Sequence, residues 1–250
     1  MKQNANILVS VVTVCYNSSA TIARTVESIL KQSYENIEYI VVDGASEDNT
    51  VEIVNKFQDL YHEKFHRFIR IISEPDKGIY DAMNKGIDAA RGTFIGILNS
   101  DDTYEPEAVS TVIQRATDDF LQICYGGIKT YQGDRLESII FFAHEFMEDR
   151  MIAHPACFVS KSVYDKYGGY NIRYESAADY EFMLRVYDKD EITFTPIYEP
   201  LANYYLGGKS TTYAGFRDKF RMLYETGRMT RWGYLCRIAA LKLQSWFERR

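Results

Sequence analysis

Acidic residues follow several short apolar segments in the first part of the chain. Asp43, Asp76 and the pair Asp101-Asp102 each stand at or shortly after the end of such a segment. If these segments are strands of one parallel sheet, their carboxyl ends share an edge, where ligands of such sheets bind. Carboxylates gathered at that edge suit Mg²⁺ or Mn²⁺, and such a cation suits a phosphorylated ligand. The positions of the acids therefore predict a metal-dependent site for a phosphorylated ligand.

The segments that must position these acids alternate between strand-like and helix-like patterns. Short runs rich in Ile and Val predict buried strands, and apolar residues at intervals of three and four predict amphipathic helices. The first 120 residues thus read as a β-α repeat of the nucleotide-binding kind. The expected strands are 7–14, 37–42, 68–72 and 93–98, and the expected helices are 18–31, 48–57, 78–91 and 105–116.

After Gly126-Gly127 the regular alternation gives way to a mixed pattern. A helix is expected at 178–187, and two more are expected at 214–226 and 233–247. The chain contains no internal repeat or obvious linker, so we expect one α/β domain with a mixed second half. The strands expected in this half are 121–125, 128–131, 136–142, 192–194 and 198–205.

The composition favours a globular enzyme of the cytoplasm. The 250 residues are 46% hydrophobic and 26% charged, which is ordinary for a globular protein. The four cysteines lie far apart, without the spacing of a zinc site or a disulfide framework, which favours a reducing compartment. The sequence shows no N-terminal signal, and no apolar stretch reaches the roughly 18 residues that cross a bilayer. We therefore expect a cytoplasmic protein that does not span a membrane.

Positive charge is concentrated near the C-terminus. Residues 216–250 contain nine Lys or Arg and three Asp or Glu, a net charge of +6, whereas the whole chain carries −6. Trp232, Trp246 and Phe247 lie among the basic residues, as in amphipathic helices that bind anionic membrane surfaces. An ordinary amphipathic helix packed on the domain is the alternative. The acidic remainder of the chain argues against a nucleic acid as partner.

Five motifs, in this order, resemble the signatures of family-2 glycosyltransferases with the GT-A fold. They are TVCYN at 13–17, VDGAS at 42–46, DKG at 76–78, NSDD at 99–102 and ADYE at 178–181. Any one of them is a weak signal, whereas five in order are strong. The resemblance implies an inverting transferase that takes a sugar from a nucleotide-sugar donor.

The resemblance covers about residues 7–210 and implies the architecture as well. It implies an α/β fold with a GT-A-type nucleotide-binding sheet, helices on both faces, a mixed second half and C-terminal helices. The catalytic domain is then 1–213, with a nucleotide-sugar-binding half at 1–120 and an acceptor half at 121–213. Basic amphipathic helices occupy 214–250. The run 74–86 is particularly similar to bacterial enzymes that build cell-surface polysaccharides.

The resemblance also implies roles for residues on the donor side. Asp43 matches the acid that accepts a hydrogen bond from the base imide, which favours a UDP-linked donor. Asp102 matches the direct ligand of a divalent metal, Mn²⁺ or Mg²⁺, with Asp101 near the ribose or the metal. The expected nucleotide-sugar-binding residues are Thr13, Tyr16, Asn17, Asp43, Asp76, Lys77 and Asp101.

The acceptor side is expected to be formed by the second half of the chain. Asp179 matches the family's general base, and Glu181 is the reserve candidate for that role. His154 and Lys209 are candidate contacts to the acceptor or to the donor phosphates, although a structural His and an ordinary Gly-rich turn remain alternatives. The acceptor expected from the resemblance is a saccharide, linked to lipid at the inner face of the cell membrane.

Two other functions remain open at this point. Nucleotidyl transfer also combines an α/β fold with acids and a metal, but it usually brings a Gly-rich basic loop after the first strand. A non-catalytic relative that only binds nucleotide sugars is the second alternative, and the presence of both Asp102 and Asp179 argues against it. The absence of GxGxxG after the first strand disfavours a Rossmann-type oxidoreductase.

Overall fold

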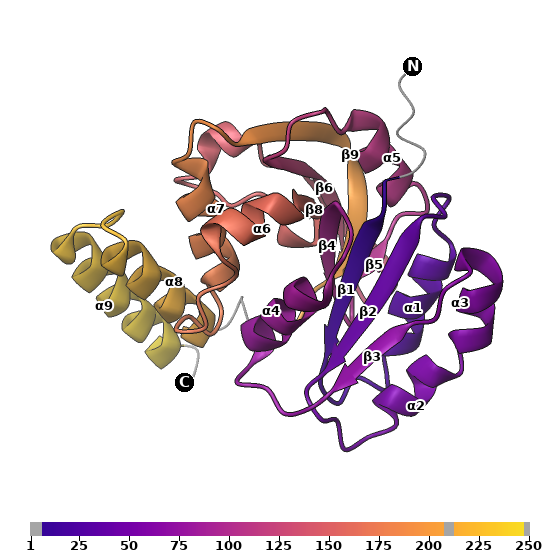
Figure 1. The fold of residues 1–250 in the computed structure, drawn as a ribbon. Coiled ribbons are helices and arrows are strands. Elements are labelled where there is room, and N and C mark those ends of the chain that lie inside the picture. The colour runs from indigo at the N-terminus through magenta and orange to yellow at the C-terminus, as the bar shows by residue number, and fades with distance from the viewer. Residues whose placement is uncertain (1–6, 208–212, 248–250) are drawn as a thin grey trace.

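A nine-stranded mixed sheet forms the centre of the computed structural model, which describes residues 7–207 and 213–247 (Figure 1). Its strands are β1 Val9–Cys15, β2 Ile37–Asp43, β3 Arg70–Ser73, β4 Phe94–Asn99, β5 Thr103–Tyr104, β6 Gln122–Gln132, β7 Arg135–Ile140, β8 Cys157–Ser160 and β9 Thr193–Tyr205. They follow the order β3-β2-β1-β4-β8-β6-β9-β5, and β7 pairs with β6. The first four are parallel, as a β-α repeat requires.

Helices cover both faces of this sheet (Figure 1). The α-helices are α1 Ile22–Leu30, α2 Thr50–Asn55, α3 Gln58–Phe65, α4 Ile79–Ala89, α5 Ala108–Arg115, α6 Lys161–Tyr167, α7 Ala178–Tyr187, α8 Tyr213–Glu225 and α9 Arg231–Phe247. Two single-turn 3₁₀ helices, η1 His144–Phe146 and η2 His154–Ala156, precede β8. The α/β architecture with helices on both faces confirms the expectation from the sequence.

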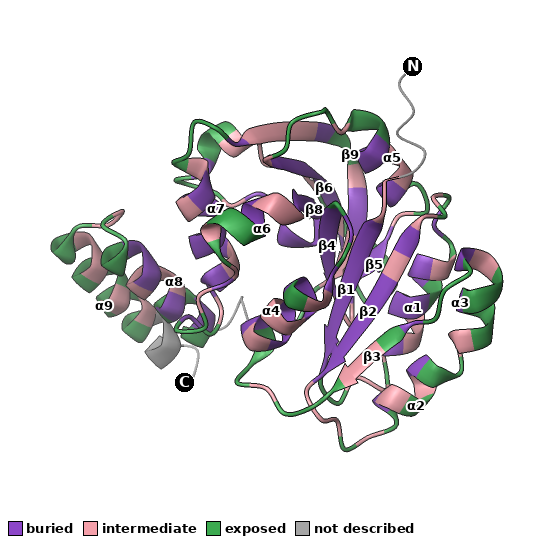
Figure 2. Ribbon diagram, in the orientation of Figure 1, coloured by how far each residue is buried: buried purple, intermediate pink, exposed green. Residues whose placement is uncertain are grey.

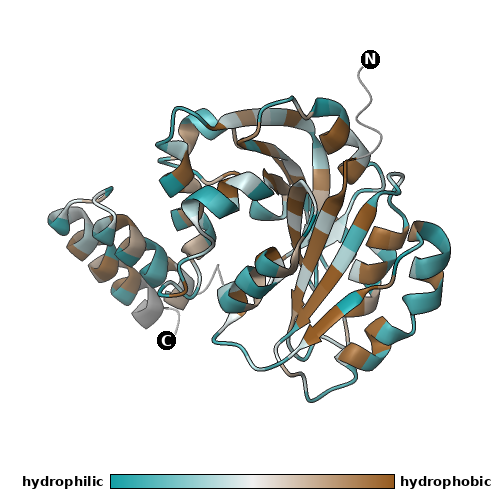
Figure 3. Ribbon diagram, in the orientation of Figure 1, coloured by the Kyte–Doolittle hydropathy of each residue, from teal (hydrophilic) through white to brown (hydrophobic). Residues whose placement is uncertain are grey.

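The side chains of β1 alternate between two hydrophobic cores, one on each face of the sheet. Val12 and Val14 point to the core that contains Met83 of α4, whereas Val9 and Val11 point to the core beneath α1 and α5. All four valines are almost inaccessible to solvent. Figures 2 and 3 show the same central strands as both buried and strongly apolar. Because neither face is exposed, the strand reads as a continuous apolar run in the sequence.

The second half of the sheet differs from the sequence prediction at two glycines. Gly126 and Gly127 suggested a break between two strands, but β6 continues through them as one strand paired with β9, with register shifts at this point. A Cβ added to Gly126 would lie 2.5 Å from the Leu201 side chain, so glycine permits the close approach of the two strands. The segments 192–194 and 198–205 are likewise one strand, β9.

The two C-terminal helices pack on the domain through α8. Met222 and Leu223 of α8 are buried in the core that also contains α4 and α7, and Asp218 accepts a hydrogen bond of 2.8 Å from the backbone N–H of Ser176. The helix α9 lies alongside α8, with the rings of Tyr224 and Tyr234 stacked at 5.1 Å. Among the described residues, no helix combines the length and the apolar character needed to cross a bilayer.

Candidate active site

The loops that carry the predicted donor-side residues meet at one edge of the sheet (Figure 1). The parallel pairing places Asp43 beside both Cys15 and Ser73, and it places Asn99 beside Val14. The carboxyl ends of β1, β2, β3 and β4 therefore lie together, as the sequence predicts. Not all of the acids at this edge face solvent, because Asp43 and Asp102 are buried.

Asp43 links the end of β2 to the end of β3 and to the loop that contains Ser46. Its side chain is fully buried, and its oxygens accept hydrogen bonds from the Ser73 hydroxyl at 2.7 Å and from the N–H and hydroxyl of Ser46. The Cys15 thiol lies 3.6 Å from Oδ1, and burial, followed by the charge of Asp43, raises the pKa of that thiol. Both oxygens of Asp43 are thus engaged within the protein in this structure, and its hydrogen bond to the base imide stays a prediction.

Asp76 lies at the same edge of the sheet and, unlike Asp43, is partly exposed. Its Oδ1 accepts a 2.8 Å hydrogen bond from the Gly78 N–H, while its Oδ2 lies where a Cβ on Gly44 would come within 2.5 Å. The same hypothetical Cβ would lie 3.4 Å from the ring of Tyr16, which is 61% exposed. Tyr16, Gly44 and Asp76 thus line one spot at the sheet edge, with the exposed Lys77 next in the chain. An aromatic face beside a carboxylate oxygen suits a planar base with an N–H donor.

Asn17 links the loop that follows β1 to the loop that follows β2. It adopts a left-handed conformation with φ of 49°, its Oδ1 accepts a 2.9 Å hydrogen bond from the Glu47 N–H, and its own N–H donates to the Ser46 hydroxyl. Asn17 therefore shapes the loop, and its contact with the nucleotide sugar stays a prediction. Thr13 does not contribute to the site surface. It is fully buried in β1 and accepts a hydrogen bond of 3.1 Å from the Tyr39 hydroxyl, so its predicted place among the donor contacts is corrected to the core.

Asp102, the predicted metal ligand, is buried at the end of β4. Its Oδ1 accepts a 3.1 Å hydrogen bond from the Tyr205 N–H, and its Oδ2 lies 3.5 Å from the amide nitrogen of Asn99. Burial, with repulsion from Asp101 as a second cause, raises the pKa of Asp102 to about 8. In this structure the side chain joins the end of β4 to the end of β9, and its role as a metal ligand stays a prediction.

Two neighbouring groups also offer oxygen atoms to a divalent cation. Asp101 is partly exposed, and Oδ1 of Asn99 is buried without a hydrogen-bond partner among the described residues. A hard cation takes such oxygen ligands and commonly completes its shell with substrate phosphates and water. No group of three His, Cys, Asp or Glu side chains in the described part of the chain is arranged to hold a metal alone. The oxygen donors present therefore fit a metal that binds together with a diphosphate.

Arg24 supports this corner of the site and was missed by sequence reasoning. Its guanidinium donates a 2.7 Å hydrogen bond to the backbone carbonyl of Asp101 and lies over the ring of Tyr205, 3.4 Å from the centroid. The ring of Tyr205 also stacks on Tyr131 at 5.3 Å. Arg24 lies within α1 and outside every motif, so its spacing in the sequence carried no signal of this role.

Asp179 stands in the first turn of α7, and its surroundings come from distant parts of the chain. Its Oδ1 accepts a 2.8 Å hydrogen bond from the hydroxyl of Tyr80, in the first turn of α4. Burial keeps the pKa of Tyr80 well above its usual value, so the phenol remains a donor. His154 lies deeper: it is buried, its Nε2 is 3.0 Å from the Tyr170 hydroxyl, and burial lowers its pKa while Asp179 opposes that shift. We correct His154 from a candidate ligand contact to a packed core residue.

Glu181, the reserve base, is engaged elsewhere. It lies two residues after Asp179 and is 8% exposed, and both of its oxygens bind the guanidinium of Arg185, at 3.0 and 3.2 Å. The same guanidinium donates to the carbonyl of Gly169. Glu181 therefore stabilises α7 and its junction with α6, and its candidate role as an acceptor or phosphate contact is withdrawn. Lys209 lies outside the described residues.

Comparison with known proteins places these residues in a family. The family model described as glycosyl transferase family 2 matches residues 10–219. A PGL/p-HBAD biosynthesis glycosyltransferase of Mycobacterium bovis is 29% identical over 206 residues, which are 81% of this chain and 79% of that protein. The chondroitin synthase of Pasteurella multocida is 32% identical over 187 residues, which are 72% of this chain but only 19% of the synthase.

Solved structures with similar folds agree with this assignment. TarS 1–349 of S. aureus in complex with UDP-GlcNAc superimposes with a TM-score of 0.70 at 16% identity, covering 94% of this chain and 71% of that one. The mannosyltransferase PcManGT from Pyrobaculum calidifontis, in complex with GDP-Man and Mn²⁺, gives a TM-score of 0.63 at 16% identity, covering 90% and 66%. At this identity the likeness shows the fold, while the match of the family model shows the family. The chain belongs to glycosyl transferase family 2 and is a glycosyltransferase.

Proposed function

We propose that the chain is an inverting, divalent-metal-dependent transferase that moves a sugar from a UDP-linked donor to a lipid-linked saccharide in surface polysaccharide biosynthesis. The observation that carries this proposal is the segment from Asp76 to Tyr80. Asp76 lines the spot beside Tyr16, and Tyr80, four residues later, binds Asp179. One short segment thus connects an acid suited to the donor base with an acid suited to the acceptor hydroxyl.

The donor base is expected to bind between Tyr16 and Asp76. The Oδ2 oxygen of Asp76 is suited to accept a hydrogen bond from the imide N–H of uracil, and the exposed Tyr16 ring is suited to flank the base. The complex of TarS with UDP-GlcNAc supports a UDP-linked donor for a chain of this fold. Lys77, exposed beside Asp76, is placed to contact the base or the phosphates.

Asp101 and Asn99 are the residues that would hold the metal, Mn²⁺ or Mg²⁺. When bound, the cation supplies Lewis-acid stabilisation of the negative charge that develops on the departing diphosphate. The complex of PcManGT with GDP-Man and Mn²⁺ supports this choice of cofactor. Arg24 keeps the backbone of Asp101 in place through its hydrogen bond to the carbonyl.

Asp179 is the proposed general base. As the acceptor oxygen forms a bond to the anomeric carbon of the donor, its proton passes to the carboxylate of Asp179. The bond between that carbon and the diphosphate oxygen breaks, and its electron pair leaves with the nucleoside diphosphate. Because attack and departure occur on opposite faces of one carbon, the single displacement inverts its configuration. Tyr80 orients the carboxylate through its hydrogen bond.

The helix α9 is the proposed contact with the membrane surface. Trp232, Leu235 and Leu243 are 79%, 46% and 61% exposed, and the basic Arg231 and Lys242 stand on the same helix. Apolar and cationic side chains on one exposed helix complement the interface of an anionic bilayer. The enzyme would then work at the cytoplasmic face of the membrane, where a lipid-linked acceptor is available.

The experiment that tests this function measures nucleotide release from a panel of UDP-, GDP- and dTDP-linked sugars, with water as the acceptor. We expect UDP-sugars to be the best donors, added Mn²⁺ to increase the rate, and Asp179→Asn to lower it by roughly 10²- to 10⁴-fold. Asp59→Asn, on the exposed part of α3, is the control and should leave the rate unchanged. Turnover of Asp179→Asn at the wild-type rate would contradict the proposed mechanism.

A further inference from the structure

The helix α7, which carries Asp179 in its first turn, begins without a side-chain cap. Its N-cap residue is Ala177, whose methyl group cannot accept a hydrogen bond from the N–H groups of the first turn. Both Ala177 and the next residue, Ala178, are buried. The point at which α7 begins therefore depends on contacts with other parts of the chain.

Asp218 of α8 provides such a contact. Its Oδ2 accepts a 2.8 Å hydrogen bond from the backbone N–H of Ser176, which lies directly before the N-cap and three residues before Asp179. Asp218 is 8% exposed, so this bond is almost out of contact with water. A carboxylate at the start of a helix is also stabilised by the unpaired N–H groups and the dipole of that helix. Asp218 therefore holds the chain where it enters α7.

The helix α8 is itself fixed against the domain. Met222 is buried in the hydrophobic core that also contains Phe182 of α7. At the end of α8, Glu225 accepts a 3.0 Å hydrogen bond from the hydroxyl of Tyr174, which is 3% exposed. The segment that leads into α7 is thus bound to α8 at two points, Tyr174 and Ser176.

We propose that Asp218 is a positioning residue for Asp179. This inference rests on the proposed function, in which Asp179 is the base that receives the acceptor proton. A general base works only within hydrogen-bond reach of that proton, and a displacement of about 1 Å can lower the rate roughly 10²-fold. The bond from Ser176 to Asp218 fixes the start of α7 and hence the place of the Asp179 carboxylate. Tyr80 binds the same carboxylate from α4, so the base is held from two helices.

The test measures nucleotide release from a UDP-linked sugar by the full chain, with water as the acceptor, below the unfolding temperature of every variant. Asp218→Ala should lower kcat by roughly ten-fold or more, because the start of α7 loses its anchor. The KM for the donor and the calorimetric affinity for UDP should stay near those of the wild type. Asp218→Asn retains an amide oxygen for the Ser176 N–H and should keep most of kcat. Wild-type kcat in Asp218→Ala, or an equal loss in both variants, would overturn the proposal.

A double-mutant cycle shows whether Asp218 acts through Asp179. Once Asp179 is Asn, Asp218→Ala should lower kcat little further, because the group that it positions is already lost. If the losses of kcat in the two single variants multiply fully in the double variant, Asp218 acts independently of Asp179 and the proposal is wrong.

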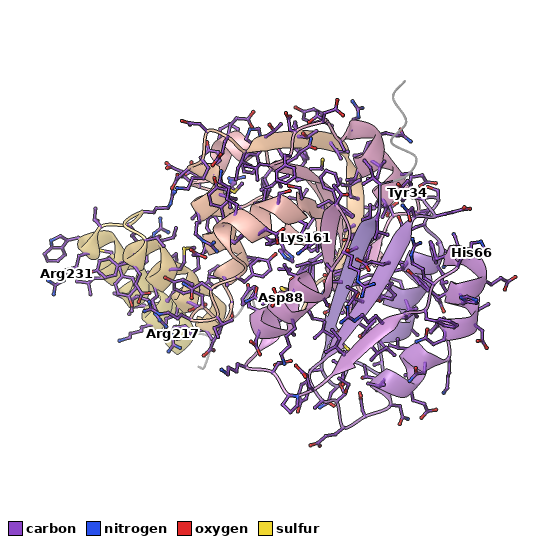
Figure 4. The ribbon with its side chains drawn as sticks, viewed as in Figure 1. Tyr34, His66, Asp88, Lys161, Arg217 and Arg231 are labelled. Atoms are coloured by element: carbon purple, nitrogen blue, oxygen red, sulfur yellow. The ribbon has the colours of Figure 1, made fainter. Side chains whose placement is uncertain are left out.

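Two control variants separate positioning from stability. Arg217→Ala changes the neighbouring, exposed position of α8, which is labelled in Figure 4. Val109→Ala lowers the free energy of unfolding from a fully buried position in the core beneath α1 and α5. Both should keep the wild-type kcat. A loss of kcat in Val109→Ala as large as that in Asp218→Ala would assign the effect to stability and overturn the positioning role.

The single variants also distinguish this inference from the proposed function. Asp179→Asn at the wild-type rate would contradict the proposed function, and the positioning role of Asp218 would fall with it. A slow Asp179→Asn together with a normal Asp218→Ala would contradict the positioning role alone.

Discussion

The hydroxyl of Tyr80 donates a 2.8 Å hydrogen bond to Oδ1 of Asp179, a residue 99 positions later in the chain. The bond joins the first turn of α4 to the first turn of α7. The ring of Tyr170 packs against the ring of Tyr80, with 5.5 Å between the centroids, and restricts the position of the Tyr80 phenol. Tyr80 is therefore a positioning residue for the proposed base, and it makes the placement of Asp179 depend on the helix that follows the donor site.

Tyr80→Phe should lower kcat by about ten-fold, because a hydrogen bond to a charged group is lost. The KM for the donor should change little, because the Tyr80 hydroxyl contacts the proposed base and not the proposed donor site. Steady-state kinetics at varied donor concentration measure both constants.

Tyr164→Phe is the matched control for this variant. Tyr164 is buried in the same cluster, but its hydroxyl lies 3.3 Å from that of Tyr170 and has no bond to Asp179. Its kcat should equal that of the wild type. If both variants lower kcat equally, the effect comes from core packing and the positioning role of Tyr80 is wrong.

Gly44→Ala should weaken UDP binding by roughly ten-fold while leaving the fold intact. The new methyl group would lie 2.5 Å from Oδ2 of Asp76 and would displace the oxygen proposed to accept the base N–H. Calorimetric titration with UDP measures the effect. In a double-mutant cycle, Gly44→Ala should cost little more once Asp76 is Ala, because the displaced group is already gone. If the losses of UDP affinity in the two single variants simply add in the double variant, the uracil base does not bind at Asp76.

Asp101→Asn should lower metal-dependent turnover by roughly 10²-fold, because a charged oxygen ligand is replaced by a neutral one. Asp102→Asn should retain the response to Mn²⁺, since its carboxylate points to the Tyr205 N–H. Mn²⁺ titrations of nucleotide release compare the two variants. Loss of the Mn²⁺ response in Asp102→Asn but not in Asp101→Asn would make Asp102 the metal ligand. Undiminished turnover in EDTA would exclude a metal altogether.

Trp232→Ser should reduce sedimentation of the full chain with phosphatidylglycerol vesicles, because Trp232 is 79% exposed on the basic helix α9. Arg231→Gln should also weaken it, with a loss of about 1 kcal/mol per basic residue at the anionic surface. Vesicles of phosphatidylcholine and added salt should each weaken binding of the wild type. Point variants are preferred to removal of both helices, because Met222 and Leu223 of α8 belong to the core. If the wild type and the variants bind phosphatidylglycerol vesicles equally, α9 does not contact the membrane and only packs on α8.

The sequence by itself determined the order of the first four strands and the meeting of the loops that follow them. Continuous apolar runs such as 37–42 are typical of strands buried on both faces, and parallel strands bring their carboxyl ends to one edge. The positions of Asp76, Asp101 and Asp179 at the ends of such elements followed from local pattern and from the family motifs. These features depend on neighbours in the sequence, which is why they were predictable.

Only the tertiary structure decided which acids at this edge are buried and which are partly exposed. Asp43 and Asp102 stand at strand ends just as Asp76 and Asp101 do, yet their oxygens are taken by Ser73 and by the Tyr205 N–H. Those partners come from other strands, and a small rotation at a strand end turns a carboxylate from solvent into the core. Charge and spacing are the same in both orientations, so the sequence does not distinguish them.

The acceptor side depended even more on long-range contacts. Glu181 was the reserve candidate for the base, and its carboxylate pairs with Arg185 one helical turn later. Asp179 is bound by Tyr80 of α4, and the chain that leads to its helix is bound by Asp218 of α8. Helices that are far apart in sequence meet only when the two halves of the sheet pack together, because burial of their apolar faces, and no local propensity, fixes their mutual position.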